Sequence, residues 1–256
     1  MTDSPHPDPA ALLAESSALW PGGALPGAPP GLESTREALH EVAERLISPA
    51  RKAATGNEIA LRWYPGGFGT PPFRDSEGER VVRVEGTELV DSREGSERRA
   101  PLTSLEDAGA PVADLVDTSG LRPDRLAIDP AAAAFLATWF CFATLTVSAL
   151  HQRASAELDA GWVQLWPEHF DVATELGLED RGARAAYGAS PGDERHAEPY
   201  LYVAPWSARP EGVLWNAEGF TGAELPYAAL AVTADPVDAA AEFFDGRLEA
   251  LIAHTG

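Results

Sequence analysis

Histidines stand among carboxylates at two points in one stretch of this chain, between Gly161 and Trp206. The first group is Glu168, His169 and Asp171, directly after a strand-like run. An imidazole beside a carboxylate can carry protons near neutral pH, because its unperturbed pKa is about 6.5. The group therefore predicts an acid–base centre in which Glu168, His169 and Asp171 are the catalytic residues.

The second group surrounds His196, which follows Asp193 and Glu194 just before a tyrosine-rich run. If the two runs form neighbouring strands, both imidazoles reach the same end of a sheet. His169, His196 and Asp193 would then be metal ligands, since zinc and related ions bind imidazole and carboxylate groups. The spacing matches no familiar zinc signature. A second interpretation is that these are solvated loop acids, because acids outnumber bases by 40 to 19. The identity of any cofactor stays open.

Aromatic side chains recur on the same two strand-like runs. Side chains alternate between the faces of a strand, so Trp162 shares a face with Trp166, and Tyr200 shares one with Tyr202. Such a wall is typical of an apolar pocket, which predicts that these four residues bind a small molecule. Ordinary core packing would explain the same pattern.

Nucleophilic catalysis has little support. Ser190 precedes a proline and looks like a turn residue, and no Gly-x-Ser-x-Gly elbow is present. The only cysteine, Cys141, lies between two phenylalanines, which predicts a buried, inert thiol.

The net charge of −21 excludes some partners. Nucleic-acid binding depends on neutralising phosphates, so we expect no nucleic-acid partner, and binding to an anionic membrane surface is disfavoured for the same reason. The N-terminus lacks the basic start of a secretory signal. With a single cysteine, this predicts a cytoplasmic protein.

The elements that would position these residues follow in a clear order. Residues 1–33 are rich in proline and glycine and predict a flexible leader, and residues 34–256 predict a single domain. Ser34 and Glu37 form a capping-box pattern at the start of a helix. Val81–Val84 and Thr87–Val90 flank Glu85-Gly86, which is typical of an antiparallel hairpin.

Asp129-Pro130 and Asp235-Pro236 each pair an N-cap residue with a proline, which predicts helices to about Arg153 and Ala253. The order of elements predicts an α+β fold with an antiparallel sheet packed against a long central buried helix and terminal helices. Ala131–Leu150 has the length of a membrane span. Its many alanines, threonines and serines favour a buried core helix instead.

Three segments together resemble a family of domains of unknown function found mainly in actinobacteria: Trp162–Asp171, Tyr200–Trp206 and Glu224-Leu225-Pro226-Tyr227. Its members carry an aromatic strand ending in Phe-Asp, a tyrosine-rich strand and a Leu-Pro-Tyr segment before a final helix. The resemblance implies a soluble, cytoplasmic single domain and carries over no catalytic residues.

Two classes of function follow from the sequence. The first is a small-molecule binding domain with an aromatic-lined pocket. The second is a hydrolase that uses His169 and the neighbouring carboxylates, with or without a metal. The binding function predicts an enclosed cavity lined by the tryptophans and tyrosines, with the acids splayed into solvent. The enzyme predicts that His169, Asp171 and His196 come together within a few ångströms at a cleft.

Overall fold

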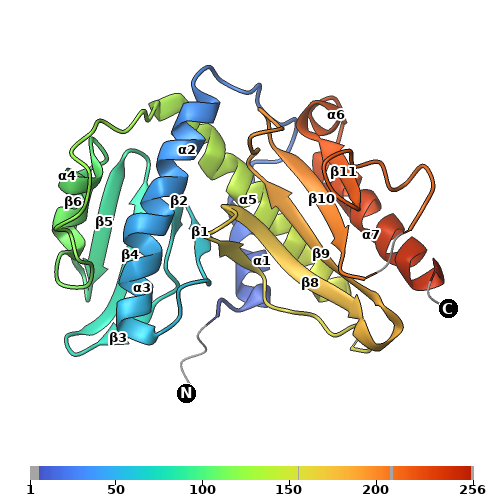
Figure 1. Cartoon of the computed structure of the whole chain (residues 1–256), viewed down its shortest axis with the longest axis horizontal. Helices are drawn as coiled ribbons and strands as arrows, with labels where there is room; N and C mark the ends of the chain where they lie inside the picture. Colours follow the sequence, from blue (N-terminus) through green and yellow to red (C-terminus); the bar gives the residue numbers. More distant parts are fainter. Residues whose placement is uncertain (1–5, 155, 208–209, 255–256) are drawn as a thin grey trace. The chain divides into compact units, whose positions relative to one another are not determined.

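The computed structural model describes residues 6–154, 156–207 and 210–254. It has the α+β fold that the sequence predicts, with 38% helix, 25% strand, two antiparallel sheets and a long, mostly buried helix (Figure 1). The chain forms two compact units, each of which is described separately. Unit 1 comprises Met1–Pro7, Ala28–Cys141 and Gln164–Phe170, and unit 2 comprises Asp8–Gly27, Phe142–Val163 and Asp171–Gly256.

The sheet of unit 1 is antiparallel, with the strand order β1-β2-β4-β5-β6 and with β3 paired to β4. The predicted hairpin is confirmed, because Glu85 pairs with Glu88 around a turn in which Gly86 has a positive φ of 61°. Its strands are β1 (Arg62–Tyr64), β2 (Gly67–Gly69), β3 (Phe73–Asp75), β4 (Gly78–Glu85), β5 (Glu88–Arg93) and β6 (Ser96–Pro101).

The glycines of β2 have a structural explanation. A Cβ at Gly67 would lie 2.3 Å from the carbonyl oxygen of Val84, and one at Gly69 would lie 2.5 Å from Cβ of Arg83. Strand β2 therefore passes so close to β4 that side chains do not fit between them.

In unit 1 the predicted capping of the first helix by Ser34 is wrong. Helix α2 has Gly31 as its N-cap, and Ser34 donates a hydrogen bond to the carbonyl oxygen of Gly31 instead of capping the helix. Pro49 does not interrupt the helical run, because the π-helical η1 leads directly into α3, near whose start the proline is tolerated. These elements are α2 (Leu32–Val42), η1 (Ala43–Ile47), α3 (Ser48–Thr55), α4 (Leu105–Gly109) and η2 (Ala110–Val112).

An aromatic cluster forms part of the core of unit 1. The rings of Phe68, Phe140 and Phe170 meet edge to face, with centroids between 5.0 and 6.1 Å apart. The ring of His40 stacks on Phe170 at 5.2 Å. Strand β7 (Gln164–Trp166) joins this unit through a bridge between Leu61 and Leu165. The cluster fixes Phe170, whose backbone has a positive φ of 55°.

Unit 2 has an antiparallel sheet in the order β11-β10-β9-β8. Helix α7 packs on this sheet, and the ring of Phe244 meets that of Tyr187 at 6.2 Å. The elements are β8 (Asp171–Leu178), η3 (Glu179–Arg181), β9 (Ala183–Ser190), β10 (Tyr200–Pro205), β11 (Ala223–Pro226), α6 (Tyr227–Ala231) and α7 (Pro236–His254). Leu201 and Val203 are fully buried, whereas Tyr200 and Tyr202 project from the opposite face of β10.

The two cap-then-proline patterns are confirmed. Asp129 Oδ1 accepts hydrogen bonds from the amides of Ala131 and Ala132 at the start of α5 (Pro130–Arg153). Asp235 does the same for Val237 and Asp238 at the start of α7. These carboxylates satisfy backbone donors that have no partner within the helix.

Among the described residues, α5 is the one helix long and apolar enough to cross a membrane by length and composition. Of its most apolar window, 83% is buried within the protein. The helix runs through Cys141 in unit 1 and continues from Phe142 in unit 2. Its burial fits the long buried helix of the predicted fold.

The predicted leader contains an element that the sequence analysis missed. Helix α1 (Pro9–Leu19) is capped by Asp8 and belongs to unit 2. Leu12 is 2% exposed and Ser16 is fully buried, so the helix has a packed side. The ring of Trp20 also meets that of Phe142 at 5.4 Å. The single domain over residues 34–256 stays a prediction.

Candidate functional site

A cavity of about 340 Å³ opens in unit 2 beside the edge strand β11. We call it the Asp193 pocket. The loop between β9 and β10 and the first residue of β10 form one side, and the loop that precedes β11 forms the other. Its lining residues are Asp193, Glu194, Arg195, His196, Tyr200, Gly219 and Phe220. Two of the predicted metal ligands, Asp193 and His196, and one predicted ligand-binding residue, Tyr200, therefore come together here.

The imidazole of His196 lies between two carboxylates. Its Nδ1 is 3.0 Å from Oδ1 of Asp193, and its Nε2 is 3.2 Å from Oε2 of Glu224 on β11. Its ring also packs against that of Tyr200, with centroids 4.3 Å apart. The contact of Nδ1 with Asp193 is a hydrogen bond, whereas the contact of Nε2 with Glu224 is an ion pair only when the imidazole is protonated. Groups from a loop and two strands thus fix the orientation of His196.

Asp193 organises the loop by accepting several hydrogen bonds. Its Oδ1 accepts from the backbone amides of Arg195, at 2.7 Å, and His196, at 2.9 Å. Its Oδ2 accepts from the hydroxyl of Tyr200, at 2.7 Å. Burial would raise the pKa of Asp193, but the hydrogen bonds to its ionised form prevail and lower it. Burial and the bond to Asp193 raise the pKa of Tyr200, which therefore stays protonated as a donor.

Tyr202 supports the pocket from the same face of the sheet. Its hydroxyl donates to the buried carboxylate of Asp171, and burial followed by the charge of Asp171 raises the pKa of Tyr202. Its ring meets those of Tyr200 at 6.2 Å and Phe220 at 6.4 Å. On the neighbouring strand, a Cβ at Gly188 would lie 2.5 Å from the Tyr202 ring, so only glycine leaves room for that ring. Of the predicted pair, Tyr200 lines the cavity and Tyr202 braces it.

The two predicted tryptophans lie elsewhere. Trp162 is 49% exposed in the segment before β7, and Trp166 is half-buried in unit 1. Neither residue lines the Asp193 pocket. The alternation along this run therefore does not extend the aromatic wall of Tyr200 and Phe220.

The predicted catalytic residues divide between the two units. Glu168 and His169 are exposed in a turn of unit 1, whereas Asp171 is buried in unit 2 and accepts the hydrogen bond from Tyr202. Phe170 separates the two parts, with its ring inside the aromatic cluster of unit 1. Although Glu168, His169 and Asp171 are close in sequence, the described contacts do not bring them together.

The predicted metal ligands also divide. His169 belongs to unit 1, and Asp193 and His196 belong to unit 2. Within residues 6–154, 156–207 and 210–254, no group of three or more His, Cys, Asp or Glu side chains is arranged to hold a metal ion. The nitrogens of His196 face Asp193 and Glu224 instead.

Several residues in or beside the pocket were missed by sequence reasoning. Arg195 donates from Nη1 to the carbonyl oxygen of Gly219 at 3.2 Å and so joins the two sides of the cavity. Glu224 reaches His196 because β11 pairs with β10, with Glu224 opposite Tyr202. Gly219 and Phe220 lie in a loop with no motif. Strand pairing is the signal that would have found Glu224.

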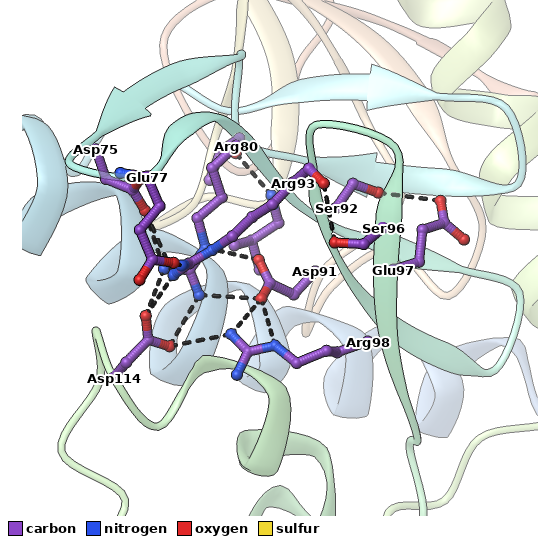
Figure 2. Close-up of polar contacts among 12 residues, drawn as sticks. Asp75, Glu77, Arg80, Asp91, Ser92, Arg93, Ser96, Glu97, Arg98 and Asp114 are labelled. Carbon is purple, nitrogen blue, oxygen red and sulfur yellow. Dashed lines mark hydrogen bonds and ion pairs between the residues drawn. The ribbon is translucent and has the colours of Figure 1, made fainter.

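Unit 1 contains a second dense polar cluster, shown in Figure 2. Arg80 is fully buried, with Nε 2.6 Å from Oδ1 of Asp91 and with Nη1 and Nη2 2.7 and 2.9 Å from the oxygens of Asp114. Arg98 donates from Nε to Asp91 at 3.0 Å. Burial disfavours the charged form of Arg80, but its bonds to Asp114 and Asp91 prevail and raise its pKa. All three nitrogens of this guanidinium bind carboxylates, so the cluster ties Asp114 to the sheet.

The chain was compared with family models, curated proteins and solved structures. No family model, curated protein or solved structure matches this chain.

Proposed function

We propose that this protein binds a small organic molecule in the Asp193 pocket. The observation that carries the proposal is a cavity of about 340 Å³ that joins the rings of Tyr200 and Phe220 to a set of converging polar groups. Ligand pockets typically have volumes of about 300–1,000 Å³ and combine apolar walls with a few placed polar side chains. Of the four predicted ligand-binding residues, Tyr200 lines this pocket and Tyr202 supports it from behind, while Phe220 adds a second ring to the wall.

The hydrogen bonding around the pocket supports binding, because it fixes the walls in advance. Asp193 holds the backbone of its own loop, and His196 and Tyr200 are held by Asp193 in turn. Arg195 joins this loop to Gly219 on the opposite side. A site whose side chains are already ordered loses less conformational entropy when a ligand binds.

The hydrolase built on His169 remains the alternative prediction, but the described contacts favour binding. Asp171 is engaged by Tyr202, and the imidazole of the pocket is His196, which lies between two carboxylates. No serine, threonine or cysteine is among the residues that line the pocket. A covalent nucleophile of these types is thus not part of its wall.

The substitution Gly219→Ala tests the proposal. The added Cβ would lie 2.8 Å from Nη1 of Arg195 and would shift that flexible side chain in the pocket. Gly246→Ala in α7 is the matched control, because a Cβ there meets no atom within 4 Å. The probes are 2-phenylethylamine, 2-phenylethanol and 3-phenylpropanoate. The binding of each is measured from the changes in amide chemical shifts of the whole chain.

We expect at least one probe to shift the amides of residues 193–196 and 219–220. Gly219→Ala should weaken that binding by about fivefold or more, equivalent to about 1 kcal/mol, and Gly246→Ala should leave it unchanged. Absence of shifts in the pocket with all three probes would overturn the proposal. Equal affinity in both variants would place binding outside this cavity.

A further inference from the structure

We infer that the ligand of the Asp193 pocket is a small organic cation, an ammonium group carried on an apolar skeleton. The inference rests on the proposed function and names the chemical class of its ligand. It combines two features of the pocket, its charge and its aromatic wall. Each makes a separate contribution that a chosen probe can isolate.

The charged groups of the pocket favour a cation. Its lining contains the carboxylates of Asp193 and Glu194, the guanidinium of Arg195 and the imidazole of His196, which lies between carboxylates. Arg195 already donates to the carbonyl oxygen of Gly219, and Glu224 adds a third carboxylate behind His196. The chain as a whole carries a net charge of −21, which attracts cations and repels anions before contact.

The aromatic wall provides a second, independent attraction. The rings of Tyr200 and Phe220 line the cavity, and both rings contact Tyr202 behind them. The face of an aromatic ring is electron-rich and attracts ammonium groups, an effect equivalent to about 2- to 30-fold in affinity. Carboxylates beside ring faces are the combination that recognises an organic ammonium, because its alkyl groups need an apolar wall and its charge needs an acid.

The arrangement of the acids favours an organic over a metallic cation. Among the described residues, no three His, Cys, Asp or Glu side chains converge on a point where an ion would be held. Asp193 directs its oxygens to the amides of its own loop, to His196 and to Tyr200. Glu194 is exposed at the rim, where it can pair with an ammonium group at the mouth of the cavity.

The three probes used above separate the ligand class from the proposed function. They share a phenyl ring on a short chain and differ in whether that chain carries an ammonium, a hydroxyl or a carboxylate. At low ionic strength we expect 2-phenylethylamine to bind about tenfold more tightly than 2-phenylethanol, and 3-phenylpropanoate to bind most weakly. If the alcohol binds as tightly as the amine, the cation inference fails while the proposed function stands. If no probe shifts the pocket amides, both fail.

Two charge variants show whether the attraction is local. Glu194→Gln removes a carboxylate of the pocket, and Glu179→Gln removes one from the exposed turn η3 of the same unit, outside the lining. Both change the net charge equally. We expect Glu194→Gln to weaken the amine about two- to fivefold, and more than the alcohol, while Glu179→Gln leaves both unchanged. Equal losses in the two variants would attribute the preference to net charge alone and overturn the inference.

The substitution Phe220→Leu isolates the aromatic contribution. Leucine keeps an apolar side chain at this position and removes the ring face. The amine should lose at least about twofold more affinity than the alcohol if the ammonium contacts that face. An equal loss for both probes would show that Phe220 acts only as apolar surface, and the aromatic part of the inference would then be wrong.

Discussion

The Nε atom of Arg80 lies 2.6 Å from Oδ1 of Asp91, and neither side chain has any solvent exposure. Removing one member of a buried ion pair leaves the other charge without compensation, which costs about 3–5 kcal/mol. Arg98 still pairs with Asp91, so we expect Arg80→Leu to lower the free energy of unfolding by about 3 kcal/mol, the lower end of that range. Urea unfolding followed by tryptophan fluorescence measures the loss.

Arg99→Leu is the control for this prediction. Arg99 also pairs with three carboxylates, those of Glu85, Glu88 and Glu97, but its side chain is 35% exposed. Exposed pairs contribute about 1 kcal/mol or less. Similar losses in the two variants would show that burial does not determine the importance of Arg80.

Asp114 makes the stability of unit 1 sensitive to acid. Its hydrogen bonds with Arg80 hold the pKa of the carboxyl well below its ordinary value of 3.8, against the opposing effect of burial. Since the pKa is lower in the folded state, the stabilisation is fully present above about pH 4 and is lost as the pH falls from there toward the folded-state value. Asp114→Asn should therefore make the free energy of unfolding decline less steeply below about pH 4.

Chemical denaturation at a series of acidic pH values measures this slope. Asp180→Asn, at an exposed position of η3, is the matched control and should keep the slope of the unaltered chain. If Asp114→Asn also keeps that slope, the pair of Asp114 with Arg80 does not form in solution.

Gly188 provides a test of packing behind the pocket. In Gly188→Ala the new methyl group would overlap the Tyr202 ring, which must move and weaken its hydrogen bond to Asp171. Overpacking of this kind costs about 1–3 kcal/mol. We expect that loss in urea unfolding, together with altered chemical shifts of the Tyr202 ring. Full stability with unaltered Tyr202 signals would contradict the packing described for this face.

Cys141 should react slowly in the folded protein. Its side chain is 5% exposed, and burial raises the pKa of the thiol from 9.0 to about 11. The thiolate is the reactive form, so a rise of about two pH units reduces reactivity about 100-fold at mildly alkaline pH. Alkylation by iodoacetamide, followed by mass spectrometry, should be slow in buffer and rapid in concentrated urea. Equal rates in the two conditions would show that the thiol is accessible. The chain has no other cysteine to confuse the measurement.

The sequence predicted features that depend on local chemistry. Asp129 and Asp235 cap their helices because a short carboxylate side chain reaches the free amides of the first turn, whatever the rest of the chain does. The hairpin at Gly86 follows from a turn that needs a positive φ. The α+β class follows from the order of such elements.

The parts of the site that were missed depend on pairing between distant segments. Glu224 meets His196 only because β11 aligns with β10, and Phe220 is brought in by the same pairing. Glu168, His169 and Asp171 looked like one group because they are neighbours in sequence. Phe170 packs in the aromatic cluster of unit 1, and the residues on either side of it belong to different units. Helix α1 was missed because prolines and glycines surround it and its apolar residues do not gather on one face.

The division of the chain between the two units affects how the protein is synthesised. The backbone passes from one unit to the other after Pro7, Gly27, Cys141, Val163 and Phe170. On the ribosome, unit 1 is therefore incomplete until Phe170 has emerged. The first helix of unit 2 is translated before most of unit 1, and the rest of unit 2 follows only afterwards. Neither unit can be copied into another gene as one uninterrupted cassette.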